Sequence, residues 1–324
     1  MPPIIADTAA INLAADLLKQ GRLVAFPTET VYGLGADASN PKAVQRIFAA
    51  KGRPNDHPLI VHIANLQQVF DWVEHVPQAA TRLAAAFWPG PLAIVLNKQP
   101  WVPMAVTGGQ STVALRMPNH RVALALLQVF GGGVAAPSAN RFCRISPTQA
   151  SHVAEELGAS VDLILDGGAC QVGVESTIVD LSGKQPRLLR PGQISLEAIE
   201  IVLGKTLLLP DSAATDIRAP GMMAVHYAPM TTTVLCASEH LAAAILSAQQ
   251  QNQRVAVLAY SQPQNTADHS MVMPASADAY AQQLYAALRQ LDALQLDKII
   301  VEQPPQTSAW RAIIDRLAKA AGRV

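Results

Sequence analysis

The chain has 324 residues, of which half are apolar and 15% are charged, and its 24 basic residues balance 24 acidic ones. Because one hydrophobic core rarely serves more than about 250 to 300 residues, this length predicts two domains. Zero net charge argues against a broad basic surface for duplex nucleic acid. No apolar run approaches the roughly 20 residues of a membrane span and no secretory signal is visible, so we expect a cytoplasmic protein with no membrane contact. The three cysteines lie far apart and predict neither disulfides nor a zinc site.

Helix and strand patterns alternate through the first two hundred residues. Asp7 is placed to cap the first helix, and Asn40 with Pro41 starts the second, which ends at Gly52. The predicted helices cover 8–20, 41–51, 65–76, 77–88, 120–130 and 147–157. The predicted strands cover 22–26, 58–63, 92–96, 112–117, 133–137, 161–168, 176–181 and 186–190. Strands that partly alternate with helices and partly form hairpins predict an α/β fold with a mixed, twisted sheet.

Two local patterns bear on how these elements begin and end. The helix over 147–157 follows a capping-box pattern, with Ser146 as the N-cap, Pro147 next and Gln149 reaching back. The glycines at 131–133 follow a helix rather than open one, so we interpret them as a helix stop and not as a phosphate-binding loop.

An irregular segment over 207–232 is too apolar for a free tether and predicts an ordered linker. Beyond it, the predicted strands cover 232–238, 254–260 and 298–303, and the predicted helices cover 239–251, 278–291 and 309–321. This alternation predicts a smaller, Rossmann-like βαβ domain. We place the first domain at 1–208, the linker at 209–232 and the second domain at 233–324.

Basic side chains supply the first functional candidates. Lys51 and Arg53 stand two residues apart on a loop shaped by glycine and proline. One interpretation is that they interact favourably with the negative C-terminal end of the helix dipole. The other is that the ammonium and the planar guanidinium together bind phosphate oxygens. Arg116 lies near the end of an interior strand, where a charge usually faces a site or a partner acid. Arg190 and Arg144 are further candidates for positive charge.

Polar residues also flank several strands. Ser138 and Asn140 lie in a turn after one strand, and Ser176 precedes another, so that an ordinary turn explains each as well as a site does. His62 lies inside an apolar strand, where a histidine is more often a core residue than a ligand. The carboxylates form no obvious metal cage, and no Ser–His–Asp order indicates a hydrolase.

Several longer segments carry a more specific signal. They are FPTETVYGLG, KGRPNDHPLIVHI, WPGPLAIVL, STVALRMPNH, APSANRFCRISPT, GVESTIVD and LLRPG. Taken in this order they resemble the Sua5/YrdC family of threonylcarbamoyl-AMP synthases and cover nearly the whole first domain. The linker segment APGMMAVHYAP is similar to the signature of the long, two-domain Sua5 type. The resemblance implies a YrdC-like first domain followed by a Sua5 C-terminal domain.

The resemblance implies a nucleotidyltransferase that makes L-threonylcarbamoyladenylate and pyrophosphate from L-threonine, bicarbonate and ATP with Mg²⁺. The product would feed t6A37 modification of tRNA through a downstream threonylcarbamoyltransferase complex. The implied catalytic residues are Lys51 and Arg53. The implied ATP-binding residues are Lys51, Arg53, Asn55, Thr112, Ser138, Asn140, Ser146, Arg190, His226 and Tyr227. The implied threonine-binding residues are Thr30, Tyr32, His62, Arg116, Ser138 and Ser176.

The linker and the loop after Asn140 give rise to separate expectations. The resemblance implies that His226 and Tyr227 reach over the nucleotide, so that the linker closes the site against water. Phe142 and Cys143 replace a Ser-Gly pair that is common in the family, which predicts a different shape for the loop that carries Ser146. Ala93 stands where threonine is frequent.

Two other functions stay open. One is a carbamoyltransferase that forms carbamoyl-adenylate, although such chains also carry zinc-finger-like modules and no C-x-x-C occurs here. The other is an RNA-binding module of a different class. Zero net charge and 5% aromatic residues weigh against it and leave room for weak RNA binding at most.

Overall fold

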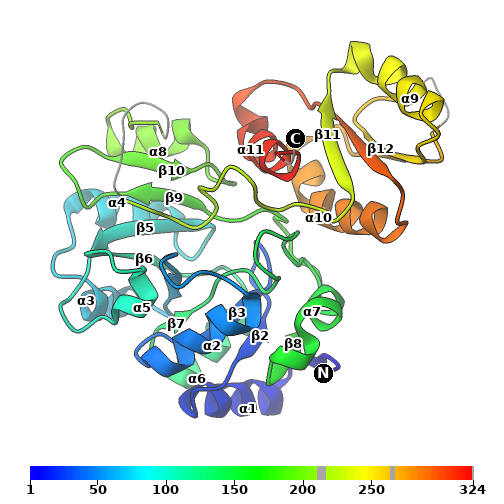
Figure 1. Cartoon of the computed structure of the whole chain (residues 1–324). Helices are drawn as coiled ribbons and strands as arrows, with labels where there is room; N and C mark the ends of the chain where they lie inside the picture. Colours follow the sequence, from blue (N-terminus) through cyan, green and yellow to red (C-terminus); the bar gives the residue numbers. More distant parts are fainter. Residues whose placement is uncertain (210–216, 263–266, 323–324) are drawn as a thin grey trace. The chain divides into compact units, whose positions relative to one another are not determined.

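The computed structural model describes residues 1–209, 217–262 and 267–322. The chain divides into two compact units, each with its own hydrophobic core (Figure 1). The first unit contains residues 1–142, 147–171 and 175–222, and the second contains 143–146, 172–174 and the chain from 223 onward. Part of the predicted linker, 210–216, lies outside the described residues, and the domain bounds at 208 and 232 stay predictions.

The first unit is built from short strands and helices that alternate along the chain. Its strands are β1 (Ile4–Ile5), β2 (Val24–Phe26), β3 (Gly33–Asp37), β4 (Ile60–His62), β5 (Leu92–Asn97), β6 (Thr112–Arg116), β7 (Val134–Ala135), β8 (Leu163–Asp166), β9 (Thr177–Asp180) and β10 (Arg187–Arg190). Its helices are α1 (Thr8–Lys19), α2 (Pro41–Lys51), α3 (Val69–Trp72), α4 (Gln78–Phe87), α5 (Met104–Thr107), α6 (Arg121–Phe130), α7 (Ala150–Leu157) and α8 (Leu196–Leu203). Short 3₁₀ turns are η1 (Leu66–Gln68) and η2 (Gly158–Ser160).

These strands form one mixed sheet in the order β1-β8-β2-β3-β7-β4-β6-β5-β9-β10. Strand β4 runs parallel to β6, whereas β5 is antiparallel to β6 and β9 is antiparallel to β10. The prediction of an α/β fold with a mixed sheet is confirmed. Both faces of the sheet are buried, because separate apolar clusters cover them.

Helix termini follow the sequence signals in most places. The Asp7 side chain accepts a hydrogen bond from the Ala10 amide at 2.8 Å and starts α1. Asn40 caps α2 with Pro41 in its first turn, and Gly52 ends that helix in the left-handed conformation with φ of 61°. Gly131 ends α6 in the same way, with φ of 81°, which confirms the helix-stop interpretation.

The prediction of a capping box at Ser146 is wrong. Helix α7 begins at Ala150, and Gln149 precedes it without any side-chain cap. The carbonyls of Pro147 and Thr148 instead accept hydrogen bonds from the amides of Tyr32 and Cys170, both at 2.9 Å. Because these pairings hold the segment extended, the helix starts only after them.

Other differences concern short elements. The helix predicted over 65–76 is a 3₁₀ turn and the four-residue α3, which ends at Trp72 before an extended residue. Strand β3, which is rich in glycine, and helix α8 were not predicted. The Gly35 position in β3 leaves no room for a side chain, since a Cβ there would lie 2.8 Å from the Phe26 ring. Close approach explains a glycine strand that propensity disfavours.

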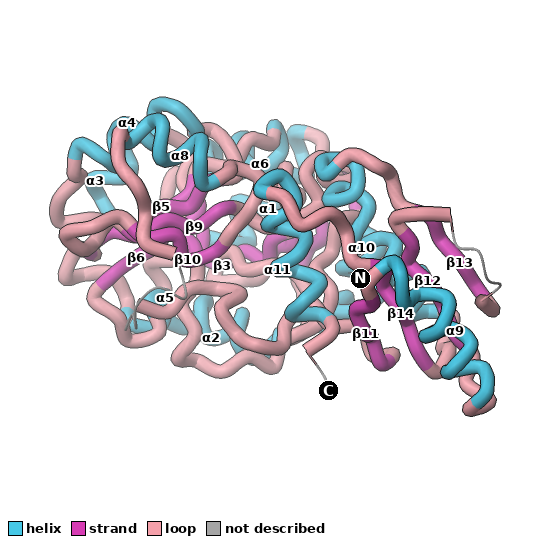
Figure 2. Tube along the Cα trace, turned by 90° about the horizontal axis from the view of Figure 1, so that it is seen from above, coloured by secondary structure: helices cyan, strands magenta, loops and turns pink. Residues whose placement is uncertain are grey.

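The second unit is an α/β domain with a parallel sheet in the order β11-β14-β12-β13. The strands are β11 (Thr232–Cys236), β12 (Val255–Ala259), β13 (His269–Val272) and β14 (Lys298–Glu302). The helices are α9 (Leu241–Gln250), α10 (Ala277–Ala293) and α11 (Arg311–Ala320), with 3₁₀ turns η3 (Ser238–His240) and η4 (Ser308–Trp310). Figure 2 shows the four strands side by side, with α9 next to them. The Rossmann-like prediction is confirmed, and β13 is an edge strand that it missed.

None of the helices within the described residues combines the length and the apolar character needed to cross a membrane.

Candidate functional site

The candidate site lies on one face of the first unit's sheet. Ile60 in β4 and Ala114 in β6 belong to an apolar cluster on that face. Because side chains alternate along a strand, His62 and Arg116, each two residues further on, project from the same face. The two residues are direct partners in the β4–β6 ladder. Polar side chains are thus placed beside an apolar floor rather than in solvent.

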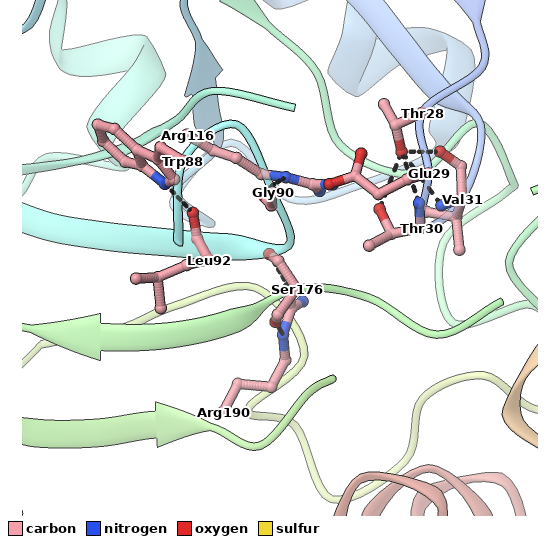
Figure 3. A network of polar contacts seen from close by, with 10 residues as sticks. All are labelled: Thr28, Glu29, Thr30, Val31, Trp88, Gly90, Leu92, Arg116, Ser176 and Arg190. Carbon is pink, nitrogen blue, oxygen red and sulfur yellow. Dashed lines mark hydrogen bonds and ion pairs between the residues drawn. The ribbon is translucent and has the colours of Figure 1, made fainter. Parts of the chain in front are cut away.

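Arg116 is buried and already paired (Figure 3). Its Nη2 lies 2.8 Å from Glu29 Oε1, and its Nε donates to the Gly90 carbonyl at 3.4 Å. Gly90 permits the close turn after α4, because a Cβ there would lie 2.3 Å from the Phe87 carbonyl oxygen. The position of Arg116 predicted either a site or a partner acid, and Glu29 is such an acid. A guanidinium held in this way can still offer its planar edge to a ligand carboxylate.

Arg190 reaches the same face through a β-bulge. In the β9–β10 ladder Leu188 pairs with Val179, but Arg190 pairs with Ile178, so Leu189 is an extra residue. The extra residue turns Arg190 toward the face on which Ile178 lies. There its Nε donates to the Ser176 carbonyl at 3.0 Å and its Nη2 donates to the Ser176 hydroxyl at 3.2 Å. Figure 3 shows Arg190 and Ser176 together at the ends of these strands.

The loop after β2 brings hydroxyl groups to the site. The Thr28 hydroxyl donates to the Val31 carbonyl at 2.6 Å and accepts from the amides of Thr30 and Val31, both at 3.2 Å. The hydroxyls of Thr28 and Thr30 lie 2.8 Å apart. Since the single proton of Thr28 is used by Val31, Thr30 donates in this pair and keeps lone pairs for a ligand.

Tyr32 holds the next segment in place from the opposite side. Its phenol donates to the Gly168 carbonyl at 2.8 Å, and burial raises the pKa of the phenol. The tyrosine is therefore neutral at physiological pH. It ties the loop after β2 to the loop after β8, which fixes where Thr30 lies.

His62 is buried and uncharged. Burial and, second, the positive charge of Arg116 lower the pKa of His62 to about 3. Its ring meets the Phe26 ring edge-on, with centroids 6.2 Å apart, and its Nδ1 has no hydrogen-bond partner among the described residues. A neutral imidazole with a buried, unsatisfied nitrogen can exchange a hydrogen bond with a bound ligand but cannot supply charge.

Lys51 and Arg53 lie at the exit of α2. Lys51 is 4% exposed, and its ammonium donates to the carbonyls of Ser138 and Asn140, which orders the turn after β7. Arg53 is half-buried and donates to the Pro58 carbonyl at 3.0 Å. Asn55, further along the same loop, is exposed. The lysine therefore links the two segments that were predicted to bind nucleotide.

The remaining predicted residues are distributed more widely. Thr112 begins β6 and so lies roughly 13 Å along the strand from Arg116. Ser146, His226 and Tyr227 belong to the second unit. The first unit thus brings His62, Arg116, Ser176 and Arg190 to one sheet face, with Thr30 in the loop beside it. The Tyr32 ring packs in the apolar cluster of the opposite face, and its carbonyl accepts a hydrogen bond from the Ala139 amide at 2.8 Å, next to the turn that Lys51 holds.

His226 and Tyr227 are held inside the second unit. Tyr227 is 1% exposed, although its φ of 62° is unusual for a residue other than glycine. Its ring stacks on Tyr285, with centroids 5.8 Å apart, and lies 5.1 Å from the buried Arg316 guanidinium. The His226 amide donates to the Lys319 carbonyl at 3.1 Å. The expectation that this pair reaches over a nucleotide stays a prediction.

The described part of the linker contacts the sheet face of the first unit. Ile217 and Ala219 pack on the apolar cluster beside the site, and the Pro220 carbonyl accepts a hydrogen bond from Arg190 Nη1 at 3.1 Å. Arg218 donates to the Gly108 carbonyl at 2.6 Å. Residues 217–222 therefore cover part of the face on which Arg116 and Arg190 lie.

Sequence reasoning missed Glu29 as a site residue. The carboxylates form no obvious metal cage in the sequence, and that pattern gives Glu29 no other role; within the described residues no group of three potential ligands forms. The carboxylate is 3% exposed and belongs to the FPTETVYGLG segment. Its place between two motif threonines was the available signal, but only the folded chain shows that it meets Arg116.

Two family models match the chain over almost its whole length. One, described as "Telomere recombination", matches residues 16–192. The other, described as the C-terminal domain of threonylcarbamoyl-AMP synthase, matches residues 194–322. Together they cover both units.

Individual relatives agree with these models. A threonylcarbamoyl-AMP synthase of Pyrococcus abyssi is 41% identical over 96% of this chain and 94% of its own length. One from Bacillus subtilis is 44% identical over 96% and 93%. The crystal structure of P. abyssi Sua5 complexed with L-threonine matches with a TM-score of 0.91 and 41% identity, covering 96% of this chain and 94% of that one.

Proposed function

The chain belongs to the family of threonylcarbamoyl-AMP synthases, and from that premise we propose that it makes L-threonylcarbamoyladenylate and pyrophosphate from L-threonine, bicarbonate and ATP. One structural observation supports this activity in addition to family membership. Arg116, His62 and Arg190 come from three strands, Ser176 directly precedes a fourth, and all four share one buried sheet face beside an apolar cluster. This face offers an amino acid both a cation and neutral hydrogen-bonding groups.

Threonine binds at the Arg116 end of the face in this proposal. The guanidinium receives the substrate carboxylate, while Thr30, Tyr32, Ser138, Ser176 and neutral His62 surround the remainder of the amino acid. A neutral histidine is suited to this place, because a second cation beside Arg116 would repel the substrate ammonium. The hydroxyl of Thr30 accepts a hydrogen bond from the ligand.

We propose that ATP binds along Lys51, Arg53, Asn55, Thr112, Ser138, Asn140 and Arg190 of the first unit. The family resemblance also implies ATP contacts from Ser146, His226 and Tyr227. The α-ammonium of threonine loses a proton to solvent, and its nitrogen forms a bond to the carbon of bicarbonate. The hydroxyl group of bicarbonate leaves as water, taking a second proton from that nitrogen. An oxygen of the resulting carbamate then forms a bond to the α-phosphorus of ATP. The bond from that phosphorus to the bridging oxygen breaks, and pyrophosphate leaves with the electron pair. Lys51 and Arg53 stabilise the negative charge that develops on these oxygens.

Mg²⁺ enters with ATP. Phosphate oxygens and water would hold most of its coordination sites, since Mg²⁺ keeps several waters and is commonly bound through substrate phosphates. The ion supplies charge neutralisation on the triphosphate. The protein residues orient the substrates and exclude water, since a carbamic–phosphoric anhydride hydrolyses readily.

The unstable product must pass quickly to an acceptor. We propose that a threonylcarbamoyltransferase complex collects it for t6A37 modification of tRNA in the cytoplasm. Direct contact with RNA is weak at most in this account, and no membrane is involved.

The test uses labelled threonine with ATP, Mg²⁺ and bicarbonate, and looks for a labelled adenylate that disappears when any one component is omitted. Lys51→Met should lower its formation about 100-fold, by analogy with the loss of one oxyanion-stabilising group. The matched control Lys42→Met changes an exposed lysine on the same helix and should leave the rate unchanged. Adenylate formation without threonine, but with carbamoyl phosphate, would favour the carbamoyltransferase alternative instead.

A further inference from the structure

Glu29 is a buried carboxylate without an assigned role in the proposed reaction. It is 3% exposed, and its Oε1 lies 2.8 Å from Arg116 Nη2. Neither of its oxygens makes a hydrogen bond to another described residue. Burying such a charge is unfavourable unless an opposite charge compensates it, so the carboxylate depends on Arg116.

The loop around Glu29 is held by hydrogen bonds of its own. The Thr28 hydroxyl accepts from the amides of Thr30 and Val31 and donates to the Val31 carbonyl, so that Thr28 is tied to the two residues that follow Glu29. Figure 3 shows the carboxylate extending from this loop toward the tip of Arg116. The carboxylate is therefore aimed at the site and not into solvent.

Several titratable groups around Glu29 are neutral at physiological pH. Burial lowers the pKa of His62 to about 3 and also lowers the pKa of His120. Burial raises the pKa values of the Tyr32 phenol and the Cys170 thiol, and the negative charge of Glu29 raises that of Cys170 further. The two histidines therefore add no positive charge that would repel a cation here, and Arg116 is the cation in contact with Glu29.

An α-amino acid carries a carboxylate and an ammonium group on the same carbon atom. If Arg116 receives the carboxylate, as the proposed function requires, the ammonium comes to lie next to whatever contacts Arg116. Arg116 contacts the Gly90 carbonyl and Glu29, and of these two Glu29 carries the charge that complements an ammonium group. We propose that Glu29 binds the α-ammonium group of the amino-acid substrate, so that Arg116 and Glu29 together bind both charged groups of the zwitterion.

This role explains why an ion pair is kept in a buried site. Without substrate, the two residues neutralise each other; with substrate, each exchanges its partner for the complementary group of the ligand. A hydroxy acid of the same shape lacks the ammonium and would leave Glu29 buried beside a neutral hydroxyl. A site whose buried polar group must be satisfied by the ligand strongly rejects ligands that lack the matching group.

The test compares two ligands by titration calorimetry, L-threonine and the corresponding 2,3-dihydroxybutyrate. Wild-type protein should bind threonine more tightly by about 30-fold or more, since leaving one partner of a buried charge pair unmatched has an effect of this size. Glu29→Gln should weaken threonine binding by a similar factor while leaving dihydroxybutyrate unchanged or tighter. Glu155→Gln, at an exposed position on α7, is the matched control and should change neither affinity.

A purely structural role predicts a different result, namely equal weakening of both ligands, and that result would overturn the proposal. If Glu29→Gln does not fold, Glu29→Asp tests the same point. It keeps the negative charge on a shorter side chain and should preserve the preference for threonine over dihydroxybutyrate. A loss of preference in a folded Glu29→Asp also counts against the proposal. If wild-type protein binds no threonine, the proposed function fails, whereas normal threonine binding by Glu29→Gln refutes this inference alone.

Discussion

Charge at single residues decides what the site can hold. Arg116 and Arg190 are buried cations, whereas His62 is kept neutral by burial and by the charge of Arg116. The amino-acid sequence predicts these residue types at strand ends but not the protonation of the histidine. Its neutrality follows from the packing that surrounds the imidazole in the folded chain.

His62 also makes stability depend on pH. Its folded pKa of about 3 lies below the unfolded value of 6.5, so the unfolded chain takes up the proton first as the pH falls. Stability from this group is fully present above pH 6.5 and is lost progressively toward pH 3. Between pH 7 and pH 5 the loss is about 2 kcal/mol.

Urea unfolding at both pH values measures this loss. His62→Gln should show about 2 kcal/mol less pH dependence than wild type, because the titrating group is gone. The control His75→Gln replaces an exposed histidine of the same unit and should behave as wild type. An identical pH dependence in His62→Gln and wild type would show that His62 is already able to protonate in the folded state.

At the scale of elements, the bulge in β10 places Arg190, and the following loop holds it there. A Cβ on Gly192 would lie 2.3 Å from the Thr177 amide nitrogen and would push this loop away from Ser176. Gly192→Ala should therefore destabilise the first unit by about 1 to 3 kcal/mol and lower adenylate formation.

Gly183 offers the matched control, because a Cβ there meets nothing within 4 Å. Gly183→Ala should leave both the unfolding midpoint in urea and the rate unchanged. If Gly192→Ala gives the same midpoint and rate as Gly183→Ala, the close contact does not position Arg190.

Most elements could be predicted from the sequence, because periodicity and caps report local interactions. Asn40, Pro41 and Gly52 define α2 through contacts within a few residues of each end of the helix. The bulge at Leu189 and the late start of α7 at Ala150 could not be predicted. Both depend on pairing with residues that are distant in the chain, and a local capping pattern cannot compete with those pairings.

At the scale of the whole molecule, the linker belongs to both units. Residues 217–222 pack with the first unit, and the chain from 223 onward packs with the second. Tyr227, in the later part of the linker, is buried and enclosed by Tyr285 and Arg316. The second unit therefore fixes the conformation of the linker's end.

Tyr227→Ala removes the ring that Tyr285 and Arg316 contact. We expect the second unit to lose about 3 to 5 kcal/mol of stability, the range for truncating a large buried ring, and threonylcarbamoyl-AMP synthesis to fall. The first unit should remain folded, with threonine binding retained. Tyr227→Phe keeps the ring and serves as the control. Wild-type pyrophosphate release from a folded Tyr227→Ala protein would contradict a role of the linker in synthesis.

The candidate site could be predicted only in part, because some of its contacts arise from the tertiary fold. Motif resemblance indicated Arg116, His62 and Ser176, and the folded sheet brings them to one face. It did not indicate that Glu29 pairs with Arg116, since that contact joins the loop after β2 to the end of β6. No local pattern in the sequence reports a contact between segments so far apart in the chain.

A crystal structure of this chain with L-threonine would test the central claim most directly. We predict the substrate carboxylate on the Arg116 guanidinium, with Thr30, His62 and Ser176 around the ligand and Glu29 at its ammonium. Threonine bound elsewhere, or bound with Arg116 still directed only at Glu29, would contradict the account.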